Sequence, residues 1–416
     1  MLTSLTTAAS AHHERLRGEI HDWIVNAALA GNDDTAILDG VCARLDAAGL
    51  PLTRVAVSSQ LLDPTLDARG VLWKRETGAT EELYPRESDP QANEDWERSP
   101  FFRLLESKEA TIRRRLDASY QRGEFPLLDT LQTKGATDYV ALAIKIDESA
   151  RFGDSEGVIS SWTTDAQNGY SDGDLAMIAA VMPAIALAFT LRTVHRTART
   201  LIATYLGDDA ALRVLGGNIV RGRAEPIRAV IWNSDLVGFT RISGTHDPEA
   251  VLAMLNDYAE AQVEAIESNG GTVLKFVGDG ILAIFPDADP ERACAQALDA
   301  ARAQCNSIDA LKLRRADAGL PITDVHLALH IGELLYGNVG SPRRLDFTVL
   351  GPAVNEVARI EALCGSLEQA VIVSSAFAEA AGAARGRLVS LGRYAMKGVA
   401  RPQEMFTLDP EIHSLG

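Results

Sequence analysis

The stretch TVLKFVGDGILAIF, residues 272–285, decides the fold of the C-terminal half of this chain. It contains two short apolar runs, Thr272–Val277 and Ile281–Phe285, separated by a Gly-Asp-Gly turn. Apolar runs rich in Val, Ile and Phe on both sides of such a turn are typical of a β-hairpin. The sequence therefore predicts a hairpin that carries Asp279 at its tip.

The segments around this hairpin extend the pattern to a βαββαβ core. An apolar run precedes Ser234-Asp235, and helical periodicity follows both this run and the hairpin. This order is typical of a ferredoxin-like α+β fold. The expected elements are strand Arg228–Asn233, helix Pro248–Glu267, the hairpin, helix Pro290–Cys305, strand His326–Ile331, strand Asp346–Leu350 and helix Pro352–Cys364.

The composition is that of a soluble globular protein with an acidic balance. The 416 residues include 40 Lys and Arg against 57 Asp and Glu, which gives a net charge of -17. Binding to duplex nucleic acid or to a membrane surface is disfavoured, because both require a basic face. The four cysteines show no C-x-x-C spacing, and the first residues show no secretion signal. We therefore expect reduced thiols in a cytoplasmic protein.

The first 190 residues alternate helical and strand-like patterns. The order of helices, strands, helix, strands and helix resembles a GAF-type sensory domain, which we assign to residues 1–171. The resemblance is one of pattern and includes no diagnostic motif. It implies a regulatory domain whose signal, a small molecule or a protein, is unknown.

The segment LAMIAAVMPAIALAFTL, residues 175–191, is uncharged and apolar. It lies at the short end of the roughly 17–25 residues that span a bilayer. Ser171 and Asp174 form an S-x-x-D capping pattern just before it. We therefore expect a buried core or dimer helix and no membrane span.

A heptad-like seam continues this helix, and we assign residues 172–222 to a helical, coiled-coil-like linker. The spacings alternate between four and three, as in the a and d positions of a coiled coil. The seam is shorter than three or four heptads, so an amphipathic helix packed on its own domain is the alternative. The seam residues are Leu187, Leu191, Val194, Ala198, Leu201 and Tyr205.

Two aspartates lie where predicted strands end, Asp235 after the first strand and Asp279 at the hairpin tip. Two carboxylates at adjacent strand ends can hold two magnesium ions across a triphosphate, the arrangement used for in-line displacement. The alternative is that Asp279 only forms a turn and Asp235 only caps a helix.

Three further polar residues stand out in apolar or helical surroundings. Lys275 lies in the apolar strand VLKFV, so either its head group meets a partner or it lies at a sheet edge. Asn355 and Arg359 are four apart on one helix face and can orient a ribose and stabilise a phosphoryl group. The alternative is an ordinary surface pair of Arg359 with Glu356. Asp346 alone reads as a solvated strand end.

Together these motifs resemble the catalytic domain of class III nucleotidyl cyclases, which we assign to residues 223–416. Four motifs in the same order make the resemblance specific. They are SDLVGFT at 234–240, LKFVGDGILAIF at 274–285, LDFTVLGPAVNEVARIEAL at 345–363 and YAMKG at 394–398.

The resemblance implies a role for each matching position. Asp235 and Asp279 hold two Mg²⁺ or Mn²⁺ ions per active site, assisted by the backbone carbonyl of Leu236. Lys275 and Asp346 select the purine, the lysine donating to adenine N1 and the carboxylate accepting from the 6-amino group. Cyclases that select guanine typically have Glu and Cys at these two positions.

The remaining roles belong to groups that contact ribose and phosphate. By resemblance, Asn355 orients the ribose, Arg359 stabilises the transition state and Lys397 contacts the β- and γ-phosphates. Each site of this family forms between two subunits, which implies a homodimer. Two positions depart from the usual pattern, Asn233 two residues before the first aspartate and His326 where some members have arginine.

The resemblance thus implies a cytoplasmic, homodimeric adenylate cyclase that converts ATP to 3′,5′-cyclic AMP and pyrophosphate. A guanylate cyclase is the first alternative, and Lys275 and Asp346 argue against it. The second is a sensory or scaffold protein whose cyclase-like domain only dimerises, and no essential aspartate, asparagine or arginine is missing.

Overall fold

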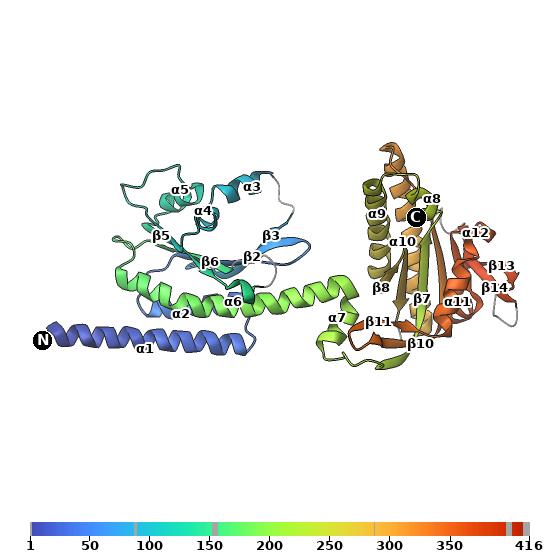
Figure 1. Ribbon diagram of the computed structural model, residues 1–416, viewed down its shortest axis with the longest axis horizontal. Helices are drawn as coiled ribbons and strands as arrows, with labels where there is room; N and C mark the ends of the chain where they lie inside the picture. Colours follow the sequence, from blue (N-terminus) through green and yellow to red (C-terminus); the bar gives the residue numbers. More distant parts are fainter. Residues whose placement is uncertain (1, 87–89, 152–156, 287, 397–401, 411–416) are drawn as a thin grey trace. The chain divides into compact units, whose positions relative to one another are not determined.

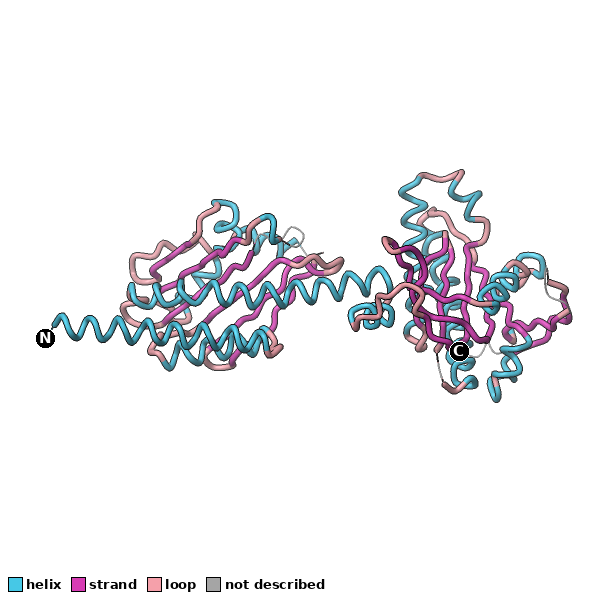
Figure 2. The backbone as a smooth tube through the Cα atoms, turned by 60° about the horizontal axis from the view of Figure 1, so that its bottom comes forward, coloured by secondary structure: helices cyan, strands magenta, loops and turns pink. Residues whose placement is uncertain are grey.

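The computed structural model describes residues 2–86, 90–151, 157–286, 288–396 and 402–410. The chain divides into two compact units, residues 1–201 and 202–416. Each unit contains one large β-sheet with helices packed on it (Figures 1 and 2). The division into 1–171, 172–222 and 223–416 stays a prediction, since α6 begins within the first unit and ends within the second.

The first unit is an α+β domain around an antiparallel six-stranded sheet with the order β3-β2-β1-β6-β5-β4. Its elements are α1 Leu2–Leu29, α2 Asp34–Ala47, β1 Arg54–Gln60, β2 Leu66–Lys74, β3 Gly78–Pro85, α3 Pro90–Glu97, α4 Pro100–Ser107, β4 Thr111–Arg115, α5 Pro126–Thr133, β5 Asp138–Lys145, η1 Glu148–Ala150, β6 Gly157–Thr164 and α6 Asp172–Leu206.

Helices cover both faces of this sheet, because its strands alternate apolar side chains between them. Val140 of β5 packs with Ile24, Val41 and Ile185 of α1, α2 and α6 on one face. Its neighbour Tyr139 packs with residues of α4 and α5 on the other. The predicted alternation of helices and strands is confirmed, while the assignment as a GAF domain stays a resemblance.

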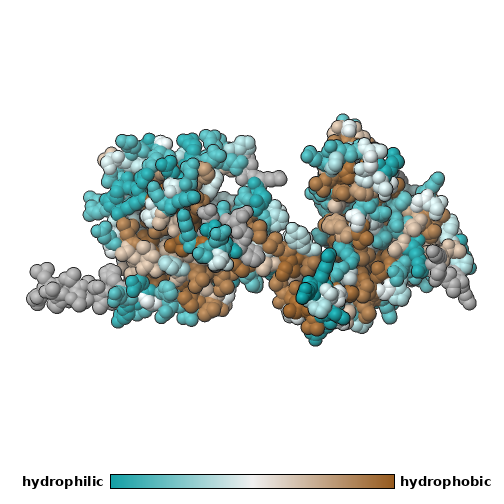
Figure 3. Space-filling model, viewed as in Figure 1, coloured by the Kyte–Doolittle hydropathy of each residue, from teal (hydrophilic) through white to brown (hydrophobic). Residues whose placement is uncertain are grey.

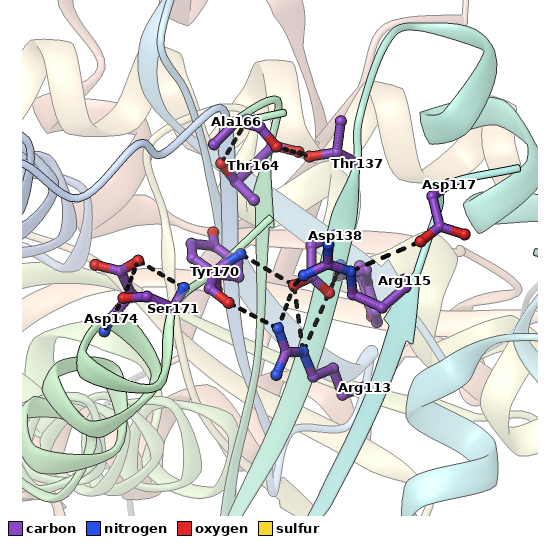
Figure 4. A network of polar contacts seen from close by, with 11 residues as sticks. Arg113, Arg115, Asp117, Thr137, Asp138, Thr164, Ala166, Tyr170, Ser171 and Asp174 are labelled. Atoms are coloured by element: carbon purple, nitrogen blue, oxygen red, sulfur yellow. Dashed lines mark hydrogen bonds and ion pairs between the residues drawn. The ribbon is translucent and has the colours of Figure 1, made fainter. Parts of the chain in front are cut away.

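A buried carboxylate ties the end of this sheet to the start of α6 (Figure 4). Asp138 is 0% exposed and accepts hydrogen bonds from Arg113 Nη2 at 2.7 Å and from the backbone N–H of Tyr170 at 3.0 Å. Directly after it, Ser171 and Asp174 cap each other as the S-x-x-D pattern predicts, at 2.8 and 3.2 Å. This network holds the N-terminus of α6 against β4 and β5.

The apolar first half of α6 is a core helix of the first unit. Met177, Val181, Ile185 and Phe189 are buried against the sheet. Within the described part of the chain, α6 is also the one helix long and apolar enough to cross a membrane, and half of its most apolar window is buried. This half of the helix therefore packs on the sheet of the first unit. The seam residues Leu187, Leu191 and Tyr205 are exposed, and the coiled coil stays a prediction.

The second unit carries the predicted βαββαβ core within an eight-stranded sheet of order β13-β14-β12-β10-β7-β9-β8, with β11 paired to β10. The elements are α7 Asp208–Leu215, β7 Ala224–Leu236, α8 Phe239–Ser243, α9 Pro248–Glu267, β8 Thr272–Val277, β9 Gly280–Phe285, α10 Pro290–Asp317, β10 Val325–Ser341, β11 Arg344–Leu350, α11 Pro352–Glu361, α12 Cys364–Leu367, β12 Val371–Ser374, α13 Ser375–Ala380, η2 Gly382–Arg387, β13 Leu388–Tyr394 and β14 Gln403–Leu408.

This core confirms the expected order β7-α9-β8-β9-α10-β10. Helix α10 is longer than expected and continues beyond Cys305 to Asp317, while α11 ends at Glu361, three residues before the expected end. One face of the sheet packs on α9 and α10, with Trp232 and Phe285 in its core. The other face packs on α11. The strand residues that point to the α11 side also carry the candidate site.

Candidate active site

Asp235 and Asp279 lie side by side because β7 and β9 pair in antiparallel register. Ser234 pairs with Ile281, so Asp235 lies opposite Gly280 and next to the hairpin tip. A Cβ at Gly280 would come within 2.1 Å of the Ser234 carbonyl oxygen. Only glycine therefore allows the tip to approach β7 so closely. The structure brings the two predicted metal ligands together, as expected from their positions at strand ends.

The electrostatics of this pair favour a cation. Burial and the neighbouring Asp279 carboxylate raise the pKa of Asp235 to about 6, and the charge of Glu361 acts in the same direction. Magnesium and manganese prefer carboxylate oxygens, and a divalent ion would offset this repulsion. No group of three or more His, Cys, Asp or Glu side chains in the described part of the chain is arranged to hold an ion. The two neighbouring carboxylates by themselves fit a divalent ion as oxygen ligands.

Glu361 is a third carboxylate of this site that the sequence interpretation missed. Burial and the Asp279 carboxylate raise the pKa of Glu361, and its Oε1 lies 3.9 Å from His326 Nδ1. His326, one of the two departures, pairs directly with Asp235 across β10 and β7. The signal was present, since Glu361 lies four residues after the buried Val357 on the same face of α11.

Lys275 and Asp346, 71 residues apart in the chain, form an ion pair. The Nζ of Lys275 lies 2.9 Å from Asp346 Oδ2, and the two side chains are 35% and 55% exposed. Lys275 sits on the edge strand β8, while Asp346 comes from β11. Both interpretations of Lys275 therefore hold: it lies at a sheet edge and its head group has a partner.

This pair lies on the same side of the sheet as the metal pair. Asn233, Leu282 and Lys275 are in register across β7, β9 and β8. Asn233, the second position that departs from the family pattern, therefore lies between Asp235 on its own strand and Lys275 two strands away. The side chain of Asn233 is partly exposed and is not packed in the core.

Asn355 and Arg359 lie on the open face of α11. The opposite face of this helix, with Ala353, Val357 and Ile360, is buried. Arg359 forms no ion pair with any residue that the structure describes. Glu356, its alternative partner, instead lies 3.9 Å from His330 Nε2. The side chains of Asn355 and Arg359 are thus exposed and available to a substrate. Lys397 lies outside the described residues.

We expect the repulsion at Asp235 to appear as a pH-dependent loss of stability. Its pKa is raised in the folded state, so folded Asp235 keeps a proton between about pH 4 and pH 6 that the unfolded chain has lost. Stability therefore falls as the pH rises through this window. Without divalent cations, Asp235→Asn should raise the melting temperature at pH 7 by about 2–4 °C, equivalent to about 1 kcal/mol after screening of this half-exposed group.

Thermal unfolding in EDTA at pH 4.5 and pH 7 measures this effect. The difference between Asp235→Asn and the unmodified chain should be only about a third as large at pH 4.5, because most of the titration window lies above that pH. Asp317→Asn, at the exposed end of α10, controls for the removal of one negative charge. An equal difference at both pH values would show that Asp235 does not titrate in this range.

Comparison with known families agrees with this arrangement. Residues 224–410 match the family model described as the adenylate and guanylate cyclase catalytic domain. An adenylate cyclase of Anabaena cylindrica is 35% identical over 146 residues, which cover 35% of this chain and 29% of that protein. Adenylate cyclase 1 of Rhizobium meliloti is 29% identical over 260 residues, 57% of this chain and 38% of that protein. The chain thus matches about a third of the length of these curated relatives.

Solved cyclase structures also resemble part of the chain. The guanylyl cyclase Cya2 is 28% identical, with a TM-score of 0.40, over 44% of this chain and 93% of that chain. The adenylyl cyclase CyaB from P. aeruginosa is 24% identical, with a TM-score of 0.41, over 45% and 96%. The assignment of residues 224–410 to the cyclase family comes from the family model and from the curated relatives.

Proposed function

Because residues 224–410 form a class III nucleotidyl cyclase catalytic domain, we propose that this chain is an adenylate cyclase that converts ATP to 3′,5′-cyclic AMP and pyrophosphate. The observation that carries the choice of ATP is the contact of Lys275 Nζ with Asp346 Oδ2 at 2.9 Å. An ammonium donor beside a carboxylate acceptor complements adenine, which offers an acceptor at N1 and a donor at its 6-amino group. Guanine presents the opposite pattern at these positions.

In the proposed reaction the 3′-hydroxyl oxygen attacks the α-phosphorus in line and pyrophosphate leaves. Asn355 orients the ribose, and Arg359 donates to the oxygens of the transferring phosphoryl group, where negative charge develops. Lys397 binds the β- and γ-phosphates. Two Mg²⁺ or Mn²⁺ ions bound by Asp235, Asp279 and the Leu236 carbonyl would neutralise the triphosphate and make the 3′-hydroxyl more acidic.

We propose that the active site forms between two copies of the chain. Asn355 and Arg359 point to solvent from α11, and apolar side chains are exposed on neighbouring strands of the same unit. Exposed apolar patches often mark contact surfaces, and Figure 3 shows such surface over α7, β10 and β11. The exposed apolar residues on the strands are Phe276, Val277, Leu335, Leu345 and Leu350.

The first unit is proposed to regulate this activity through α6, which continues from its core to the border of the second unit. The proposed location is the cytoplasm, where ATP is available, with α6 as a core helix rather than a membrane span. The acidic balance of the chain supports a partner other than nucleic acid.

Chromatography of the products made from ATP and from GTP, with Mg²⁺ and separately with Mn²⁺, tests the proposal. Cyclic AMP from ATP alone is the expected result. Cyclic GMP as the main product would assign the chain to guanylate cyclases instead. Absence of both products, from the full chain and from a fragment starting at Ile202, would support the scaffold alternative.

We expect the double variant Lys275→Glu/Asp346→Cys to exchange the purine preference. It replaces the donor and the acceptor that complement adenine, so kcat/KM for ATP should fall at least about 100-fold while turnover of GTP rises. Arg344→Gln, an exposed neighbour on β11, should leave both values unchanged. An unchanged ratio of the two kcat/KM values in the double variant would mean that this pair does not read the base.

A further inference from the structure

The first unit contains a cavity of about 300 Å³ between the β2–β3 hairpin and the second half of α6. Its walls come from the segment after β1, from β2 and β3, and from α6. A volume of this size is at the lower end of the range for small-molecule sites. The predicted nucleotide site uses only residues of the second unit, so this cavity is a separate feature.

One side of the cavity carries a cluster of arginines around a buried carboxylate. Arg69 Nη1, Arg192 Nε and Arg196 Nη1 lie 3.5, 3.9 and 3.6 Å from the carboxylate oxygens of Asp34. Asp34 is buried, and its Oδ1 has no hydrogen-bond partner among the described residues. These separations exceed the roughly 2.7–2.9 Å of a charge-assisted hydrogen bond. The guanidinium groups therefore keep donors that Asp34 does not use.

Arg196 is the arginine best placed to bind an anion. Arg69 also pairs with Glu81, and Arg192 donates to the carbonyl oxygen of Gly31 at 3.0 Å. Arg196 lines the cavity, is 33% exposed and donates no hydrogen bond to any described residue. A planar guanidinium with free donors matches a carboxylate in shape and charge.

The acidic groups on the wall are already engaged. Asp63 Oδ1 accepts hydrogen bonds from the backbone N–H groups of Thr65 and Leu66 at 2.8 and 3.0 Å. Its charge is therefore held in the turn before β2. Glu81 is paired with Arg69. Neither of these carboxylates forms an ion pair with Arg196 among the described residues; its ion-pair partner is Asp34, 3.6 Å away.

The remaining walls are apolar or hydroxyl-bearing. Leu61, Leu66 and Leu83 contribute aliphatic surface from the strand side, while Thr197 and Thr200 face the cavity from α6. Leu83 is exposed, which is unfavourable for a large aliphatic side chain unless something covers it. The cavity thus combines an arginine that keeps unused hydrogen-bond donors with an apolar wall.

We propose that this cavity binds a small amphipathic carboxylate. Its carboxylate accepts hydrogen bonds from Arg196, and its aliphatic part packs on Leu61, Leu66 and Leu83. Three of the residues that the ligand touches, Arg196, Thr197 and Thr200, belong to α6.

Isothermal titration of the full chain with hexanoate tests this proposal, with 1-hexanol and inorganic phosphate as comparison ligands. Saturable binding of hexanoate at one site per chain is expected, at least tenfold tighter than either comparison ligand. Hexanol lacks the anion, and phosphate lacks the aliphatic part. Equal binding of phosphate would overturn the amphipathic specificity, and absence of saturable hexanoate binding would overturn the site.

Two variants and a matched control locate the binding. Arg196→Gln should weaken hexanoate binding at least tenfold, whereas Arg199→Gln, an exposed arginine on the same helix, should not change it. Leu83→Asn, at an exposed position on the apolar wall, is a second variant that tests the aliphatic contact, and it should also weaken hexanoate binding. If Arg196→Gln and Leu83→Asn both bind hexanoate as tightly as the unmodified chain, the ligand binds elsewhere. Because the readout is heat of binding, it does not depend on cyclase activity.

Discussion

A mixture of the Asp279→Ala and Arg359→Ala variants should regain cyclase activity that neither variant has alone. Each change should lower activity at least about 100-fold, the loss typical when a group that stabilises transition-state charge is removed. If one chain supplies the metal carboxylates and the other supplies Arg359, a mixed dimer keeps one intact site. Random mixing makes half of the dimers mixed, so roughly a quarter of the unmodified activity is expected.

A pair of variants from the same half of the site provides the control. Asp235→Ala mixed with Asp279→Ala should stay inactive, because every site of the mixed dimer then lacks one carboxylate. Two different affinity tags on the variants show whether mixed dimers have formed. Mixed Asp279→Ala/Arg359→Ala dimers that form and remain inactive would contradict a site shared between chains.

Asp138→Asn should lower the free energy of unfolding of the first unit by about 3 kcal/mol. Asp138 is fully buried, and Arg113 donates to it from a side chain that is 31% exposed. Removing the charge from one partner leaves the other poorly compensated, which typically costs about 3–5 kcal/mol when both are buried. Because Arg113 is partly exposed, we expect a loss at the lower end of this range, about 3 kcal/mol. Thermal unfolding should show a decrease of roughly 6–12 °C in the transition of this unit.

The rim of the same network supplies a matched control (Figure 4). The Oδ2 of Asp117 lies 4.0 Å from Arg115 Nε, and both side chains are exposed. Asp117→Asn should change the free energy of unfolding by less than about 0.5 kcal/mol. Equal effects of Asp117→Asn and Asp138→Asn would mean that burial of the carboxylate does not determine its contribution.

Local sequence was sufficient to predict the core of the second unit. The hairpin at 272–285 and the helices after it follow from apolar periodicity and turn residues, which act over a few positions. Asp235 and Asp279 could be placed together because each lies where a predicted strand of the same sheet ends. The capping of α6 by Ser171 and Asp174 was predictable for the same reason, since the interaction spans three residues.

Tertiary structure decided the contacts that join distant segments. Periodicity states that a residue is on a helix or strand face but does not state which element covers that face. The depth of Glu361 in the site depends on how α11 packs on the sheet, and the assignment of α6 to its own domain depends on what its apolar face meets.

The sequence by itself thus determined the order of the elements in the βαββαβ core and, through the resemblance of its motifs to class III cyclases, which residues are expected to act on the nucleotide. Only the tertiary structure showed the 2.9 Å contact of Lys275 with Asp346, which the resemblance implied only as a shared role in purine selection, and placed Arg69 and Arg196 around Asp34 beside a cavity. The physical reason is range: turns, caps and periodicity act within a few residues, whereas these charge clusters join strands and helices from separate parts of the chain.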